Sequence, residues 1–177
     1  AAKTEGEVAG VMAHEISHVA LRHGTAQQSK ATPYEIGSVA GQILGAILGG
    51  TAGAVVSQGA QFGFGTAFLR FSREYEKQAD ILGSHIMANA GYDPRDMANM
   101  FKTIEKTSGN GGPQFLSDHP SPKNRAQYIT EEAKLLSITH PVRNANEFTD
   151  VRAHLQKMAP APTSEEVARK GKRPTPS

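Results

Sequence analysis

The most constraining feature of the sequence is an uncharged segment, Ile36 to Leu69, in which glycine recurs at every fourth position from 37 to 53. In a helix, this spacing places the glycines on one face, where a second backbone can approach closely. The segment indicates either a membrane-inserted helix or a buried, tightly packed helix or helical hairpin with its bend at 58–65. Its glycines, serines and glutamines dilute the hydropathy, and only one such stretch exists, so we expect the buried form.

The remainder of the chain is also predicted to be helical. Capping and stop signals indicate helices at about 4–23, 72–90, 93–107, 121–136 and 147–158, with a flexible loop at 108–113. Thr4 and Glu7 form a capping-box pattern, Ser72 is a candidate N-cap, and Gly24 and Gly91 are candidate stops. No stretch shows convincing strand alternation. We therefore expect a mainly α, compact multi-helix domain with little or no sheet.

In the first of these helices, four apolar residues share one stripe at the helical period and are expected to face the core: Val8, Val11, Met12 and Val19.

Composition limits the chemistry. The 177 residues contain no cysteine, which excludes disulfides, thiol catalysis and Cys-ligated metal sites. A net charge of +2 is too balanced for an electrostatic nucleic-acid binder, so no nucleic-acid partner is expected. We expect a single domain over 1–158 and a disordered, Pro-rich basic tail over 159–177. No signal for an oligomeric state is present.

An HExxH motif, His14-Glu15-Ile16-Ser17-His18, lies within the first predicted helix. Residues four apart lie on one helix face, so both imidazoles can converge on one metal ion, and neutral imidazole suits Zn²⁺. Glu15, at the edge of that face, is placed to take a proton from a metal-activated water.

Two other histidine arrangements fit the sequence less well. The metzincin extension requires a glycine at position 21 and a histidine at position 24, where this chain has Leu21 and Gly24. His23 lies nine residues beyond His14, about half a turn round a continuous helix, so we expect it to point away and to meet the last carbonyl groups.

A catalytic zinc site needs a third protein ligand, and Ser72 to Asp80 is the outstanding segment for it. Glu76 and Asp80 are four apart and share a face, whereas Glu74 should face elsewhere. A ligating glutamate, with an aspartate one turn on that holds a ligating histidine, is a known arrangement around zinc. The alternative is an ordinary charged helix start.

Three blocks together resemble a known family. HEISHVALRHG, then SREYEKQAD about sixty residues later, then DHPSPKNR are similar to the HtpX-like and CAAX-prenyl-protease-like gluzincin metallopeptidases of metallopeptidase family 48. The resemblance covers about residues 5 to 130, and a glycine-rich stretch between the first two blocks also resembles soluble bacterial members.

The resemblance implies a zinc-dependent endopeptidase that hydrolyses unfolded or misassembled polypeptides. It implies one Zn²⁺ held by His14, His18 and Glu76, with Glu15 as general base and Asp80 as a partner of a ligand histidine, His14 above all. His14, Glu15 and His18 lie in the first block, and Glu76 and Asp80 lie in the second.

The same resemblance places two more residues at the site. His119 is expected either to stabilise the oxyanion or to reach the open zinc position in the resting enzyme, and Arg125, one turn into the following helix, is a further candidate catalytic residue. A periplasmic or membrane-associated bacterial location is also implied.

In this family, a strand that pairs with extended substrate normally precedes the HExxH helix by twenty to thirty residues. Only thirteen residues precede His14 here, so we expect an N-terminally truncated domain. Two alternatives therefore stay open: a non-catalytic chaperone-like or interaction module that retains a zinc site, and an integral membrane protease that uses 36–56 as a span.

Overall fold

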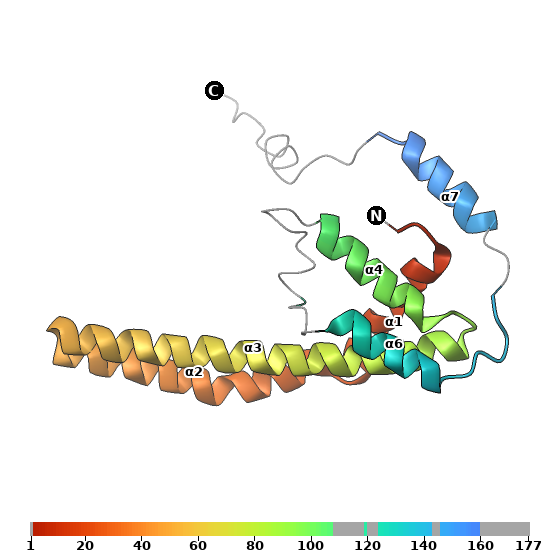
Figure 1. Cartoon of the computed structure of the whole chain (residues 1–177). Coiled ribbons are helices and arrows are strands. Elements are labelled where there is room, and N and C mark those ends of the chain that lie inside the picture. The colour runs from red at the N-terminus through yellow and green to blue at the C-terminus, as the bar shows by residue number, and fades with distance from the viewer. Residues whose placement is uncertain (1, 108–118, 120–123, 143–145, 160–177) are drawn as a thin grey trace, which may run out of the picture. The chain divides into compact units, whose positions relative to one another are not determined.

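The computed structural model describes residues 2–107, 119, 124–142 and 146–159. Its helices are α1 (Glu5–Ala20), α2 (His23–Leu48), α3 (Gly50–Asn89), α4 (Pro94–Thr107), α6 (Arg125–Leu135) and α7 (Asn146–Lys157), and the described residues contain no strand (Figure 1). The mainly α prediction is confirmed. The predicted loop at 108–113, most of the predicted tail at 159–177 and the predicted helix start at Ser121-Pro122 lie outside the described residues.

The chain divides into two units, Ala1–Arg143 and Asn144–Ser177. The first unit contains α1, α2, α3, α4 and α6, and the second contains α7, which has no buried residue. All candidate site residues belong to the first unit.

Helix α1 buries small and polar residues rather than the apolar stripe. Thr4 caps it as predicted, its side chain accepting a hydrogen bond from the Glu7 amide at 3.1 Å. The predicted core stripe is wrong for Val8, Met12 and Val19, the last two of which are 58% and 78% exposed, whereas Val11 packs against the core as predicted. The buried face consists of Gly6, Glu7, Gly10, Ala13, His14 and Ser17.

Small side chains explain this choice of face, since they let neighbouring helices come close to α1. A β-carbon on Gly10 would lie 2.7 Å from the Met97 backbone of α4. One on Gly83 of α3 would lie 3.3 Å from the backbone of Ala13 and His14. Close backbone packing against α3 and α4 therefore decides which face of α1 turns inward.

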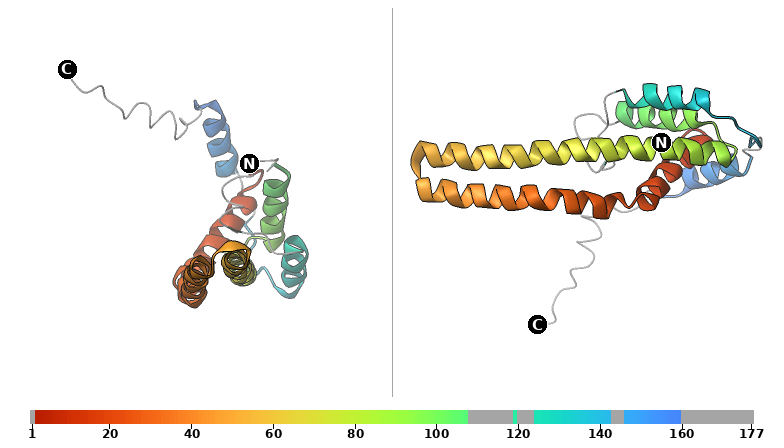
Figure 2. Two further views of the ribbon diagram at one scale, coloured as in Figure 1. Left: turned by 90° about the vertical axis from the view of Figure 1, so that its left-hand side faces the viewer. Right: turned by 90° about the horizontal axis from the view of Figure 1, so that it is seen from below.

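Helices α2 and α3 form a long antiparallel hairpin (Figures 1 and 2). Its turn is at Gly49 and Gly50, both with positive φ (63° and 56°), so the predicted bend at 58–65 is wrong. Positive φ favours glycine, and the Gly-Gly pair supplies two such positions in succession.

Two predicted helix boundaries are also wrong. Gly24 lies inside α2, because the break falls earlier, at Arg22, whose φ is 55°. Ser72 lies inside α3, where it is buried and its hydroxyl accepts a hydrogen bond from the Gln27 side chain at 2.9 Å. Ser72 would suit an N-cap position, but packing against α2 allows α3 to continue through it.

The prediction that the uncharged segment is buried is only partly right. A β-carbon on Gly41 would lie 2.4 Å from Ala60, and one on Gly45 2.1 Å from the Ser57 hydroxyl, so the glycines form a close seam as expected. The large aliphatic side chains of the segment point outward and are exposed. In the described part of the chain, no helix combines the length and hydropathy needed to span a bilayer.

The hydrophobic core lies where α1, α3, α4 and α6 meet. Its buried members are Ala13, Met87, Met97, Ala98, Met100, Phe101, Ile104 and Ile129. Burying each of the larger side chains contributes about 1.5–3 kcal/mol relative to exposure. This core includes Ala13, next to His14, and packs α1 against the C-terminal part of α3.

Candidate metal centre

Four side chains from three parts of the chain converge on one point. His14, His18, Glu76 and His119 each offer a ligand atom, and these atoms all lie within 4.8 Å of one another. The Nε2 atoms of His14 and His18 are 3.1 Å apart. The Glu76 carboxylate lies 3.2 Å from each of these two nitrogens.

The helices account for this convergence. His14 and His18 lie one turn apart on α1, and Glu76 reaches them from α3, whose Gly83 permits close contact with α1. Glu74 is exposed and accepts a hydrogen bond from Gln78, so it faces away as predicted.

The donor set and its spacing fit a zinc ion. Tetrahedral ligands at about 2.0–2.1 Å from Zn²⁺ are separated from one another by about 3.3 Å. The separations among His14, His18 and Glu76 are 3.1–3.2 Å. His119 Nδ1 lies 3.3 Å from His14 Nε2 and 3.1 Å from Glu76, which is the spacing of a fourth ligand.

His14 is held from behind by a buried polar network. Its Nδ1 lies 2.9 Å from Asp80 Oδ1, which also accepts a hydrogen bond from Arg125 at 2.7 Å. Tyr128 donates its hydroxyl to the other Asp80 oxygen. With Nδ1–H donating to Asp80, the lone pair of Nε2 faces the ligand cluster.

His18 has an equivalent partner that the sequence analysis missed. His23 is buried, and its Nδ1 lies 3.1 Å from His18 Nδ1 while its Nε2 lies 3.2 Å from Gln78 Oε1. The expectation that His23 points away is wrong because α1 ends before it. The left-handed Arg22 redirects the chain and brings His23 back onto a stacked contact with Tyr75, with ring centroids 4.6 Å apart.

The pKa values of these groups follow from burial and from their partners. Burial lowers the pKa of His14, but hydrogen bonds to Asp80 and Glu76 outweigh it, and the pKa is raised. Burial raises the pKa of Glu76, but hydrogen bonds with His119, His14 and His18 hold it far below its usual range. Burial lowers the pKa of His23, which favours the neutral ring. Glu76 thus keeps a negative charge at the centre, as a cation site requires.

Glu15 lies on the open side of the centre. Its side chain is 48% exposed, and its Oε1 is 3.5 Å from His119 Nε2. Glu15 and His18 line an open groove of about 420 Å³ together with Val19, Arg22, Gly24 and Thr25. Solvent can therefore reach the carboxylate beside the ligand cluster.

Arg125 lies on the opposite, closed side. Arg125 is the first residue of α6, and Asn124 directly before it has a φ of 62°. The guanidinium is 2% exposed, pairs with Asp80 and Glu76, and lies 3.5 Å from the centroid of the Phe101 ring. This placement favours a positioning role over contact with substrate.

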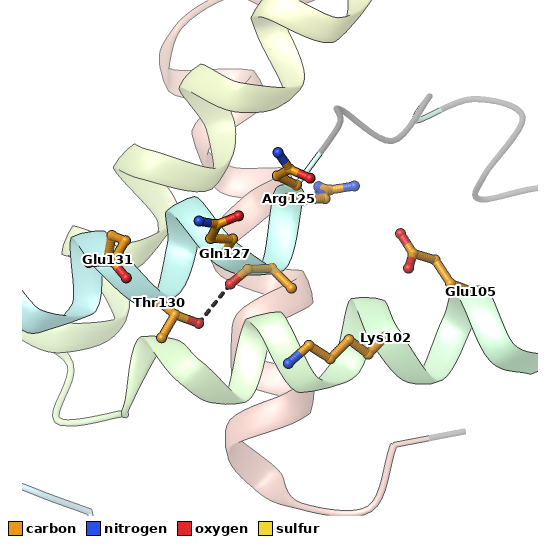
Figure 3. A pocket seen from close by; sticks show the side chains of 8 residues that line it. Lys102, Glu105, Arg125, Gln127, Thr130 and Glu131 are labelled. Carbon is orange, nitrogen blue, oxygen red and sulfur yellow. Dashed lines mark hydrogen bonds between the residues drawn. The ribbon is translucent and has the colours of Figure 1, made fainter.

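A second groove, of about 480 Å³, lies between α4 and α6 and shares Arg125 with the centre (Figure 3). Lys102 and Glu105 line it from α4, and Gln127, Thr130 and Glu131 line it from α6 (Figure 3). It contains none of the four candidate ligands, whereas the groove beside Glu15 contains His18.

In one class of zinc peptidases, two histidines of an HExxH helix and a glutamate from another helix bind the metal. A second glutamate, next to the first histidine, is the general base. Residues 1–133 match the family described as Peptidase family M48. The chain belongs to this family of peptidases.

Three curated relatives illustrate the similarity. The chain is 30% identical to the beta-barrel assembly-enhancing protease of Escherichia coli (strain K12), over 68% of this chain and 26% of that protein. It is 33% identical to the mitochondrial metalloendopeptidase OMA1 of Arabidopsis thaliana, over 73% of this chain and 25% of that protein. It is 30% identical to the metalloprotease LoiP of Escherichia coli (strain K12), over 72% of this chain and 50% of that protein.

The chain thus spans from about a quarter to half of the length of these relatives. No solved structure matches it significantly.

Proposed function

We propose that this chain is the catalytic region of a zinc-dependent endopeptidase that hydrolyses unfolded or misassembled polypeptides. The observation that carries the proposal is the convergence of His14, His18 and Glu76, with Glu15 on the open side. Membership of a peptidase family supports the reaction class. The name of the beta-barrel assembly-enhancing relative supports a substrate of the misassembled kind.

His14, His18 and Glu76 would hold the zinc ion, and a zinc ion there supplies Lewis acidity that activates a water molecule and polarises the scissile carbonyl. Glu15 accepts the proton of the attacking water and passes it to the departing amine. Its exposure to the groove suits both transfers, because the carboxylate must reach water first and the leaving group afterwards.

His119 has two roles open to it in this proposal. With Nδ1 at ligand spacing from Glu76 and His14, it closes the fourth position of the resting site. In the other role, its ring leaves that position, faces the substrate carbonyl and stabilises the oxyanion. Its Nε2 contact with Glu15 keeps the ring close to the base in the first of these positions.

Asp80 and Arg125 act behind the ligands. Asp80 fixes the tautomer of His14, and the positive charge of Arg125 partly offsets the two buried carboxylates with which it pairs. Without that guanidinium, Asp80 and Glu76 would repel each other in a buried environment.

The location and boundaries complete the proposal. We place the protein in the bacterial periplasm, on the resemblance to exported family members, and assign the catalytic domain to residues 1–158. The compact unit Ala1–Arg143 already contains every proposed ligand.

The test compares three substitutions in the whole chain: Glu15→Gln, Glu76→Ala and Glu35→Ala. Glu15→Gln should bind zinc as the unmodified chain does and lose at least about 100-fold in casein hydrolysis, the contribution of a general base. Glu76→Ala should weaken zinc binding because a ligand is lost. Glu35→Ala, which removes an exposed glutamate of α2 twelve residues beyond His23, is the control and should change neither measurement.

Zinc content is measured by atomic emission, and hydrolysis is measured with and without a chelator. Undiminished cleavage by Glu15→Gln would remove Glu15 from its role. Stoichiometric zinc without any chelator-sensitive hydrolysis would instead favour an interaction module that retains a zinc site.

A further inference from the structure

The end of the α2–α3 hairpin is an exposed apolar surface that the proposed chemistry does not use. We define the hairpin tip as residues 43–56. It contains no charged residue and one polar side chain, Thr51. Ile47 is 76% and Val55 71% exposed, and three further aliphatic side chains there are at least half exposed: Ile43, Leu44 and Leu48. The distal part of the hairpin extends away from α1, α4 and α6 (Figures 1 and 2).

The exposed side chains lie on both outward sides of the hairpin. Gly45 and Gly53 occupy the seam, where a β-carbon on either would contact the opposite backbone within 2.1–2.6 Å. Ile43 and Ile47 of α2 and Val55 of α3 are directed away from that seam. A second copy or a folded partner would cover one of these sides, whereas lipid surrounds a protruding tip on all of them.

Polar residues bound the tip at matching heights on the two arms. Gln42 is seven residues before Gly49, and Gln58 is eight after Gly50. At about 1.5 Å per residue, both amides lie about 10–12 Å from the turn. The nearest charged residues, Glu35 and Arg70, lie farther along each arm. An apolar cap of this depth matches the about 5–10 Å to which interfacial helices enter a bilayer surface.

We propose that the hairpin tip inserts into the surface of a lipid bilayer and anchors the protein there without crossing it. Insertion buries the aliphatic side chains, while helical hydrogen bonds satisfy the backbone along the two arms on either side of the turn. The tip has no basic residue, so binding is driven by apolar burial and depends little on anionic lipid or salt. Glu76 lies 26 residues beyond Gly50 on one continuous helix, which holds the metal centre up to about 40 Å from the tip.

Flotation of the whole chain with phosphatidylcholine vesicles tests this anchor. The unmodified chain should float, with a similar bound fraction when a quarter of the lipid is phosphatidylglycerol and when salt is raised. The double variant Ile47→Glu/Val55→Glu should lose at least about tenfold in partitioning, because two charges enter the apolar layer. Both positions are exposed, so the fold should survive, which circular dichroism and zinc content check.

The matched control is Leu135→Glu, an equally exposed apolar residue at the end of α6, which should float as the unmodified chain does. Failure of the unmodified chain to float, or equal flotation of the double variant, would overturn the proposal. So would a dimer in sedimentation equilibrium that the double variant dissociates while no lipid binds, since a second copy would then cover the tip.

The absence of cysteine allows an independent reading of depth. A single environment-sensitive label on Leu48→Cys should shift to shorter emission wavelength with vesicles. The same label on Gln28→Cys, exposed on α2 far from the turn, should not shift. Shifts at both positions would mean that the chain lies flat, which contradicts insertion by the tip. Neither flotation nor the label's emission depends on zinc or hydrolysis, so both are independent of the proposed function.

Discussion

At the scale of single residues, the two ligand histidines are oriented by different kinds of partner. The partner of His14 is the Asp80 carboxylate, which accepts a hydrogen bond from it. The partner of His18 is the neutral ring of His23. Gln78 sets the direction of the hydrogen bonds that link His23 to His18. Its amide nitrogen donates to Glu74 at 3.2 Å, so its oxygen faces His23 Nε2–H, and His23 Nδ1 is left to accept from His18 Nδ1–H.

This arrangement predicts that His23→Ala weakens zinc binding about 10- to 100-fold, the usual effect of removing a partner of a metal ligand. Zinc affinity is measured by competition with a chromophoric chelator. His23→Gln should recover part of the affinity, because its amide can still meet His18. His85→Ala removes an exposed histidine that pairs with Glu132 and should leave the affinity unchanged. Equal affinity of His23→Ala and the unmodified chain would show that His18 needs no such partner.

The candidate ligands were predictable because the information is local. His14 and His18 are one helical turn apart, and Glu76 and Asp80 are one turn apart on a second helix, so each pair needs only a correct helix to share a face. His23 was not predictable by the same logic. Its position depends on the left-handed conformation of Arg22, and arginine carries no signal for it.

At the scale of elements, the glycines of the hairpin have two different roles. Gly49 and Gly50 form the turn with positive φ, while Gly41, Gly45 and Gly53 form the seam. The Gly-Gly dipeptide was the available signal for the turn, but the four-residue repeat runs through it and masks the change of helix. The repeat therefore predicted close packing correctly and the position of the bend wrongly.

The seam predicts opposite effects for two glycines of the same helix. Gly53→Ala places a β-carbon 2.1 Å from the Gly45 carbonyl oxygen, a backbone atom, and should destabilise the hairpin by about 1–3 kcal/mol through overpacking. Gly59→Ala meets nothing within 4 Å and should stabilise α3 by about 0.5–1 kcal/mol. Hydrogen exchange of the hairpin amides compares the two variants. Similar exchange in both would mean that the helices are not in close contact.

At the scale of the whole molecule, small residues at the helix contacts of the first unit leave room for the buried side chains of the site. Gly10 lets α4 approach α1, Gly83 lets α3 approach α1, and the resulting space holds buried His14, Glu76 and Asp80 with their partners. Local sequence patterns predict the helices but not which of their faces pack together. For this reason Val19, expected in the core, is exposed, while nearby Ser17 is buried.

Because ligands from α1 and α3 meet around one point, a bound metal ion should tie these helices together and stabilise the whole first unit. An ion that binds only the folded state at 100 times its Kd adds about 2.7 kcal/mol to the free energy of unfolding. Chelation should therefore lower the Tm of the unmodified chain and of Glu35→Ala, but not that of Glu76→Ala, which starts from the lower value. A chain ending at Arg143 should show the same chelator-dependent shift, since it keeps every candidate ligand. Differential scanning calorimetry with and without chelator measures all four proteins. Loss of the shift in the shortened chain would show that residues beyond 143 complete the centre, which would support the longer domain boundary at 158.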